Sequence, residues 1–555
     1  MESNNLLEID DLCVEFKSDD GWRRVVDKVS YSLRRGETLG IVGESGSGKS
    51  VSSLAIMGLL PSNARVSGTI RMLDAEGKPV VPVELGRNVA MVFQEPMTSL
   101  NPVQKCGAQV VEMLRQHEHV DADEAKKRVV EMFREVLLPR PEKIFDSYPH
   151  EISGGQKQRV MIAMALICHP DLIIADEPTT ALDVTVQKTI LELMRQLQQK
   201  YGMGILFISH DLGVVAQISD HVAVMYHGRI VEQGTKDQVL YHPQHPYTQG
   251  LLACRPPLDS RPEHLPTVKE FLEGKIPSEA PLDDRVGEKL QGEKEVLLKV
   301  RNINVTYTLK KNLLGKPLQQ LKGVDGISFD VYRGETLGLV GESGCGKTTL
   351  GRAILRLVDS QSDCLEFDGH RLDMLSASAM RKLRPKIQII FQDPYSSLNP
   401  RITIGEAILE PLRNYNMYKD DEERRRQVMD MMDRVDLARD WFDRYPHQLS
   451  GGQRQRVCIA RALVLRPELV ICDESVSALD VSVQAQVLNL LNDLKSHYGF
   501  TYVFISHDLS VVRYFSDRIM VMEKGRIVES GLADDLFANP QEPYTQKLIA
   551  AIPKV

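Results

Sequence analysis

The sequence contains one long set of motifs twice, and this repeat constrains the fold more than any other feature. The copies lie 298 residues apart in the first two motifs and 297 apart in the later ones, so one residue is lost between 102 and 148. Six pairs carry the repeat: GESGSGKS at 43–50 and GESGCGKT at 341–348, FQEPMTSLNP at 93–102 and FQDPYSSLNP at 391–400, YPHEISGGQKQRV at 148–160 and YPHQLSGGQRQRV at 445–457, LIIADEPTTALDVTVQ at 172–187 and LVICDESVSALDVSVQ at 469–484, FISHDL at 207–212 and 504–509, and HPYTQGLL at 245–252 and EPYTQKLI at 542–549. The chain is therefore one fold used twice, rather than a solenoid of short repeats.

Composition excludes several classes of protein. Apolar residues make up 42% and charged residues 26% of the 555-residue chain, as in soluble globular proteins. The net charge of −8 excludes a nucleic-acid polycation. The longest apolar run, 160–168, is far shorter than the roughly 18–20 residues that cross a bilayer, and MESNNLLEID does not resemble a signal peptide. The eight cysteines are scattered without C-x-x-C spacing, which predicts reduced thiols in a cytosolic compartment.

The repeat predicts two domains, 1–254 and 297–555, joined by a linker over 255–296. The linker holds six prolines, ten acidic and seven basic residues and almost no apolar periodicity, so we expect it to be exposed. A small extra domain is the alternative, and the scarcity of apolar residues argues against it.

Apolar patterning predicts an α/β fold in each half. LLEIDDLCVEF and LLKVRNINVTY alternate as strands do. LIIAD and LVICD are short, bounded apolar runs that predict buried parallel strands. The stretches 103–147 and 401–444 predict helices, since apolar residues recur there at spacings of three and four, as in EAKKRVVEMFREVLL.

Each half contains the pattern G-x-x-x-x-G-K-[ST], at 43–50 and at 341–348. Its glycines let the backbone curl so that N–H groups point at phosphate oxygens, and the following helix adds its positive end. Lys49 and Lys347 can reach the outer phosphates, while Ser50 and Thr348 offer hydroxyls to Mg²⁺. Both copies follow a strand and precede a helical stretch, which is the context that the pattern requires.

Two carboxylates stand at the end of the buried strand in each half. Asp176 and Asp473 are placed to hold the metal or its water. Glu177 and Glu474 follow directly and can orient or deprotonate a water that attacks the γ-phosphate. An ordinary ion pair with a nearby lysine is the alternative for an isolated Asp-Glu, and the phosphate loop in the same domain argues against it.

Further motifs resemble those of the ATP-binding cassette (ABC) proteins. These are ISGGQ at 152–156, LSGGQ at 449–453, and the Ala-Leu-Asp segments that end at Asp183 and Asp480. The resemblance covers both halves almost completely. It implies two P-loop NTPase domains, each with a mainly parallel core sheet, an antiparallel β part and an inserted α-helical subdomain. It also implies that the two cassettes pair head to tail within one chain, with each signature covering the γ-phosphate held by the other cassette.

The same resemblance implies functions for individual residues. His210 and His507, with Glu177 and Glu474, are the expected catalytic residues, and Gln94 and Gln392 are expected to contact the metal and the attacking water. Phe16 and Tyr307 fit the aromatic residue that stacks on adenine, although a core aromatic is the alternative. The expected ATP-binding set is Phe16, Gly43, Glu44, Ser45, Gly46, Ser47, Gly48, Lys49, Ser50, Gln94, Ser153, Gly154, Gly155 and Gln156, with Tyr307, Gly341, Glu342, Ser343, Gly344, Cys345, Gly346, Lys347, Thr348, Gln392, Ser450, Gly451, Gly452 and Gln453. The expected Mg²⁺ ligands are Ser50, Gln94, Asp176, Thr348, Gln392 and Asp473.

The segments after the glutamines, and the H-P-Y-T and E-P-Y-T segments after each cassette, resemble the ATPase subunits of bacterial peptide importers of the dipeptide, oligopeptide and nickel group. Here two such subunits look fused, as in importers of microcin C or glutathione. The resemblance implies a peripheral ATPase at the cytoplasmic face of the inner membrane, which uses ATP and Mg²⁺ to energise import of a peptide-like solute. Its partners would be two transmembrane permease subunits, docked near 95–148 and 393–445, and an extracytoplasmic solute-binding protein.

Four features refine this interpretation. Only Cys254 remains where related first cassettes carry a cysteine cluster, so we expect no iron–sulfur centre. Ser475 replaces a proline beside the metal strand but removes no catalytic group. The alternative function, a soluble tandem cassette acting on ribosomes or nucleic acid, fits poorly with an acidic, proline-rich linker. A non-hydrolysing clamp conflicts with Glu177 and Glu474 both being present.

Overall fold

The apolar runs LIIAD and LVICD form buried interior strands of two sheets of the same topology. These are β6 (Leu172–Asp176) and β16 (Leu469–Asp473). The computed structural model describes residues 4–18, 21–93, 99–180, 182–258, 260–275, 295–311, 317–477 and 479–553. Within these residues the strand orders are β5-β6-β7-β3-β8-β9 and β15-β16-β17-β12-β18-β19, parallel except for the last strand of each. The prediction of buried parallel strands is confirmed.

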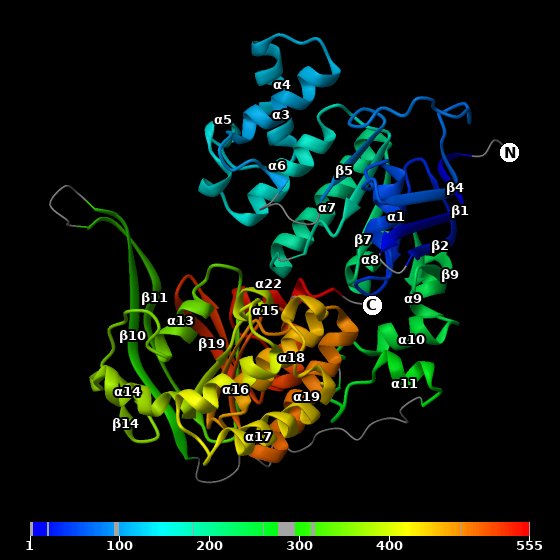
Figure 1. Ribbon diagram of the computed structural model, residues 1–555. Helices are drawn as coiled ribbons and strands as arrows, with labels where there is room; N and C mark the ends of the chain where they lie inside the picture. Colours follow the sequence, from blue (N-terminus) through cyan, green and yellow to red (C-terminus); the bar gives the residue numbers. More distant parts are fainter. Residues whose placement is uncertain are drawn as a thin grey trace.

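The first half contains an antiparallel sheet, the parallel sheet and two groups of helices (Figure 1). Its elements are β1 (Asn5–Ser18), β2 (Gly21–Arg34), β3 (Thr38–Val42), α1 (Lys49–Ile56), β4 (Ala64–Met72), β5 (Val89–Val92), α3 (Cys106–His117), α4 (Ala122–Glu135), α5 (Pro141–Asp146), α6 (Gly154–Leu166), β6, α7 (Val184–Tyr201), β7 (Gly204–Ser209), α8 (Leu212–Ile218), β8 (His221–Tyr226), β9 (Arg229–Thr235), α9 (Lys236–Tyr241), α10 (Pro246–Ala253) and α11 (Val268–Leu272).

The second half has the same main order of elements, with β14, α14 and α15 inserted around β15. Its elements are β10 (Val296–Lys311), β11 (Pro317–Tyr332), β12 (Thr336–Val340), α13 (Lys347–Ile354), β13 (Cys364–Phe367), β14 (His370–Arg371), α14 (Ala377–Leu383), β15 (Ile387–Ile390), α15 (Pro394–Ser397), α16 (Ile404–Asn414), α17 (Asp421–Arg434), α18 (Gly451–Leu463), β16, α19 (Val481–Tyr498), β17 (Thr501–Ile505), α20 (Leu509–Phe515), β18 (Arg518–Glu523), β19 (Arg526–Leu532), α21 (Ala533–Ala538) and α22 (Pro543–Ala550). The predicted α/β class, with an antiparallel part and an inserted helical part in each half, is confirmed.

The helical part of the first half, α3–α6, lies at the top of Figure 1, and its α6 packs against β5, as α18 packs against β15 in the second half. Asp121 caps α4 by accepting hydrogen bonds from the amides of Asp123 and Glu124, which fixes where this helix begins. The helical parts of both halves share one close contact, in which Gly107 and Gly405 each lie against a phenylalanine ring. The helix predicted within 124–138 is present as α4, which begins and ends a few residues earlier, at Ala122 and Glu135.

Part of the expected exposed linker is folded instead. Leu265 is fully buried, and its backbone exchanges two hydrogen bonds with the side chain of Asn489 in α19, at 2.9 and 2.8 Å. Arg261 donates to backbone carbonyl oxygens at the end of α20, and α11 packs on α10. The low apolar content led to a wrong prediction of exposure for this part of the linker. A few residues, such as Leu265, are enough to hold the segment against the surface of the second half. Residues 276–294 of the linker lie outside the described residues.

Candidate active sites

The phosphate loops follow β3 and β12, at the edge where the parallel strands end. Glycine is required at Gly43, where a Cβ atom would lie 2.1 Å from the Met225 carbonyl oxygen, and at Gly341, where it would lie 2.2 Å from that of Met522. Their φ angles of 155° and 151° are also unfavourable for other residues. The sequence thus folds each loop tightly against a neighbouring strand and directs it into the helix that begins at the lysine.

The two loop lysines are buried within the structure. The Lys49 ammonium donates to the carbonyl oxygens of Gly43 and Glu44, at 2.7 and 2.9 Å. Lys347 does the same with Gly341 and Glu342, at 2.7 and 3.1 Å. Burial lowers the pKa of Lys49, although the nearby carboxylates, Glu177 first, act in the opposite direction. Each ammonium is held over its loop, where an anionic ligand would meet it.

Each loop hydroxyl meets the aspartate predicted to bind metal with it. Ser50 donates to Asp176 at 3.1 Å, and Thr348 donates to Asp473 at 2.8 Å. Burial raises the pKa of Asp176 to about 6, and it raises the pKa of Asp473 as well. A hydroxyl and a carboxylate side by side are ligands that suit Mg²⁺, and a bound cation would offset the cost of burying the charge.

Glu177 and Glu474 turn away from their strands in a strained conformation. Their φ values are 48° and 49°, in the left-handed region that glutamate rarely adopts. Their amides donate to the carbonyl oxygens of Ile208 and Ile505, both at 2.9 Å, which holds this turn in place. A conformation of this kind costs on the order of 1–3 kcal/mol and is typical of functional sites.

The strained turn brings each glutamate to its predicted histidine. The distance from His210 Nδ1 to Glu177 Oε1 is 3.2 Å, and from His507 Nδ1 to Glu474 Oε2 it is 3.6 Å. Burial raises the pKa of Glu177, but the hydrogen bond and charge of His210 outweigh it, so the pKa lies below the usual value. The pKa of Glu474 is lowered in the same way by His507. Both glutamates are therefore ionised at neutral pH, as a general base must be.

The glutamines and aromatics are placed less uniformly. Gln392 donates to Glu474 at 2.6 Å, whereas Gln94 lies outside the described residues. Tyr307 is 39% exposed on β10 and its hydroxyl lies 3.4 Å from that of Thr349, in the first turn after the second phosphate loop. Phe16 is half-buried on β1 and packs against the core of the first half. The exposed ring of Tyr307 fits a stacking role better than the ring of Phe16 does.

The two signatures begin helices α6 and α18. The Ser153 hydroxyl accepts a hydrogen bond from the Gln156 amide, and the Gln156 side chain accepts one from the Ser153 amide. Ser450 and Gln453 form the same reciprocal pair. This capping box leaves the amides of the intervening glycines at a helix N-terminus, where they suit an anion.

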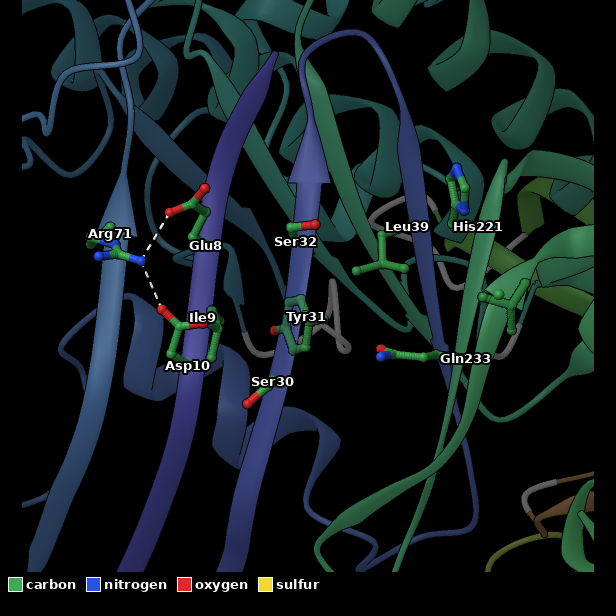
Figure 2. Close-up of a pocket in the computed structure, with 12 residues that line it drawn as sticks. Glu8, Ile9, Asp10, Ser30, Tyr31, Ser32, Leu39, Arg71, His221 and Gln233 are labelled. Atoms are coloured by element: carbon green, nitrogen blue, oxygen red, sulfur yellow. Dashed lines mark hydrogen bonds and ion pairs between the residues drawn. The ribbon is translucent and has the colours of Figure 1, made fainter. Parts of the chain in front are cut away.

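A cavity of about 490 Å³ in the first half is lined by none of the predicted site residues. Figure 2 shows it between β1 and β2 on one side and β8 and β9 on the other, with Arg71 bridging Glu8 and Asp10. A smaller cavity of about 90 Å³ lies between the halves and is lined by His210 and His507 together. Only the smaller one belongs to the predicted chemistry.

Comparison with known proteins accounts for the repeated motifs. A family model described as "ABC transporter" matches residues 26–180 and 324–477. The chain belongs to the ABC transporter family. As a member it is an ATP-binding, ATP-hydrolysing protein with two cassettes. A second family model, "Oligopeptide/dipeptide transporter, C-terminal region", matches residues 231–279 and 528–555, after each ABC cassette.

Relatives from two Escherichia coli strains match the whole chain. The "Glutathione import ATP-binding protein GsiA" of Escherichia coli K12 is 46% identical over 100% of this chain and 90% of its own length. The protein of the same name from Escherichia coli O157:H7 is 47% identical over the same shares. The solved structure of cbiO1 from Clostridium perfringens, part of the transporter complex cbiONQ, is 28% identical, with 44% of this chain and 92% of that one covered and a TM-score of 0.39.

The two ABC cassettes contact each other through their phosphate loops. Thr185, in the first turn of α7, donates to the Glu342 carboxylate at 2.7 Å, and the equivalent Ser482 on α19 donates to Glu44. The Ser45 amide also donates to the Asp480 carboxylate at 3.0 Å. Sequence reasoning did not predict Thr185 and Ser482, because it expected only the signatures to meet the opposite phosphate loop.

The segments after each cassette contribute a further contact that the sequence analysis missed. Tyr247 on α10 and Tyr544 on α22 accept hydrogen bonds from the phosphate-loop amides of Glu44 and Glu342, at 3.1 and 3.0 Å. The only signal in the sequence was that P-Y-T recurs in both copies.

Proposed function

We propose that the chain is the ATPase subunit of a bacterial importer for a small peptide of the glutathione kind. The observation that carries this proposal is the set of Lys, Asp, Glu and His at the end of the parallel sheet, present in both cassettes with matching contacts. The solute class rests on relatives that are named for glutathione import and share 46–47% of their residues with this chain.

In this proposal each cassette binds ATP with its own phosphate loop. Lys49 and Lys347 exchange their loop carbonyls for phosphate oxygens. Glu177 and Glu474 take the proton of the attacking water, while His210 and His507 hold the glutamates in orientation. Ser50 with Asp176, and Thr348 with Asp473, would hold Mg²⁺, which neutralises phosphate charge when bound.

Head-to-tail pairing within the chain completes each site. This pairing is supported by the positions of the signatures. Each signature lies next to the start of α7 or α19, and these helix starts contact the opposite phosphate loops. A Cβ atom on Gly155 would lie 2.7 Å from Val186, and one on Gly452 would lie 2.5 Å from Val483. Since Thr185 and Ser482 are the immediate neighbours of these valines, each signature is close to the other cassette's loop.

The importer would contain partners that this chain does not supply. No helix in the described parts of the chain is long and apolar enough to cross a membrane. We propose that two permease subunits form the pore, that the helical parts bind them from the cytoplasmic face of the inner membrane, and that an extracytoplasmic binding protein delivers the solute.

Transport by the assembled importer tests the proposal. The chain is expressed with its neighbouring genes, and membrane vesicles are assayed for uptake of radiolabelled glutathione. We expect uptake that requires ATP and is lost in the Glu177→Gln, Glu474→Gln variant. Uptake that the double variant sustains would overturn the proposal, as would a chain that sediments with ribosomes and leaves the membrane fraction.

A further inference from the structure

One peptide group in each phosphate loop is held from two opposite sides. The carbonyl oxygen of Gly43 accepts the Lys49 ammonium at 2.7 Å, and the N–H of Glu44, in the same peptide group, donates to the Tyr247 hydroxyl at 3.1 Å. Because a peptide group is planar, a partner that fixes the N–H also fixes the direction of the carbonyl. The tyrosine therefore helps determine where the lysine is held.

The second cassette repeats this arrangement with different neighbours. The Gly341 carbonyl accepts Lys347 at 2.7 Å, and the Glu342 N–H donates to the Tyr544 hydroxyl at 3.0 Å. Tyr247 is fully buried and stacks on Tyr226 with 4.1 Å between the ring centroids, which restrains its hydroxyl. Burial raises the pKa of Tyr247 and of Tyr544, so both hydroxyls stay neutral and can accept from an amide.

The tyrosines belong to the segments after each cassette that are typical of oligopeptide and dipeptide transporters. In the second cassette the same segment makes a second contact with the loop, since Lys547 lies 3.6 Å from the Glu342 carboxylate. It also lies beside α7 of the first cassette, where Figure 1 shows α22 below the end of that helix. These segments therefore support the phosphate loops directly.

We propose that Tyr247 and Tyr544 are positioning residues for nucleotide binding, each acting on its own cassette through the peptide group that orients the loop lysine. This inference rests on the proposed binding of ATP at both loops. The segments after each cassette would thus have a role inside the ATP sites. Loss of either hydroxyl should weaken nucleotide binding at one site only.

The test uses the full chain with one site disabled. In the Lys347→Ala chain only the first site is left to bind, and Mg²⁺ with the non-hydrolysable analogue AMP-PNP is titrated by calorimetry. We expect Tyr247→Phe to weaken binding roughly five-fold, the effect of one lost hydrogen bond, and Tyr544→Phe to leave it unchanged. In the Lys49→Ala chain the two effects should exchange.

Tyr502→Phe serves as a matched control, because Tyr502 is also fully buried and its hydroxyl donates to the Leu491 carbonyl, at 3.2 Å. It should leave binding at both sites unchanged. In the otherwise unmodified chain, the Tyr247→Phe, Tyr544→Phe variant should raise KM for ATP and keep kcat. A merely structural role would lower the folded fraction, and so kcat, at constant KM.

The outcomes separate this inference from the function on which it rests. A Lys347→Ala chain that binds no analogue at all would overturn the ATP site and the inference with it. Normal binding by that chain, combined with unchanged affinity in Tyr247→Phe, would overturn the inference alone. Tyr544 is only partly buried, so Tyr544→Phe tests the same contact where folding is least affected.

Discussion

Asp183 and Asp480 occupy equivalent positions in the two cassettes but bind different partners. The Asp183 carboxylate caps its own helix by accepting from the Val186 amide at 3.0 Å. The Asp480 side chain makes no such cap and accepts from the Ser45 amide of the opposite cassette. The same residue can therefore stabilise a helix start or join the two cassettes, and the structure contains one example of each.

Other differences also concern the surroundings of the sites. Lys547 reaches Glu342 in the second cassette, whereas Gly250 stands at the equivalent position in the first. Residues 260–273 connect the first cassette to α19 and α20 of the second. By contrast, Lys, Asp, Glu and His are the same in both sites. The two sites therefore have the same chemical groups, but the contacts around them differ.

The largest expected effect tests whether the chemistry is equal. Glu177→Gln and Glu474→Gln each remove one proposed general base, which we expect to slow hydrolysis at that site by about 10²–10⁴-fold while ATP still binds. The double variant should be nearly inactive. Single-turnover hydrolysis and nucleotide binding are measured for both single variants and for Glu192→Gln, an exposed control on α7. One single variant retaining full activity while the other is inactive would show that the two sites differ in chemistry.

Cross-linking tests the symmetry of the pairing. In a cysteine-free chain with both catalytic glutamates changed to Gln, we expect cysteines at Ser45 and Gly451 to cross-link within one monomer when ATP is bound. Gly451 is chosen because a Cβ there meets nothing within 4 Å, whereas Gly452 would clash with Val483. Ser343 with Gly154 is the equivalent pair at the other site. The yield is measured by gel mobility after oxidation.

The control pair is Ser45 with Gly154, both in the first cassette, which should not cross-link. Efficient reaction of that pair, or products that join two chains, would contradict the head-to-tail arrangement. Cross-linking of only one of the two expected pairs would show that the two ATP-bound sites differ from each other, as the contacts of Asp183 and Asp480 do.

Local patterns predicted most of the fold and brought out the residues that we propose for catalysis. The phosphate loops, the strand 172–176 and the glutamates depend on residues close together in the sequence, so their motifs carry the information. The hydrogen bond of Tyr247 to Glu44, the partner of Thr185 and the burial of Leu265 depend on contacts between residues 157 to 224 positions apart. No periodicity reports such contacts, and Leu265 looked exposed because its partner Asn489 belongs to the other cassette.

The unequal capping of α7 and α19 predicts a smaller difference, in stability. Asp183→Ala removes a helix cap and should lower the free energy of unfolding of the first cassette by about 1 kcal/mol. Asp480→Ala removes no cap, and its hydrogen bond to the Ser45 amide is exposed to solvent, so the second cassette should change by less than about 0.5 kcal/mol. Each cassette has one tryptophan, Trp22 or Trp441, so urea unfolding is followed by fluorescence in Trp441→Phe and Trp22→Phe chains respectively. Equal losses would contradict the difference in capping.

The smallest expected effect concerns the loop after the catalytic glutamate. Ser475 is buried where the first cassette has Pro178, and the preceding residues, Glu474 and Glu177, share nearly the same φ, 49° and 48°. Because the backbone already has the conformation that precedes a proline, Ser475→Pro should stabilise the second cassette by about 0.4–1 kcal/mol by restricting the unfolded chain. The reciprocal Pro178→Ser should destabilise the first cassette by a similar amount, measured by the same fluorescence. A destabilising Ser475→Pro would show that the two loops differ in backbone conformation despite their shared motif.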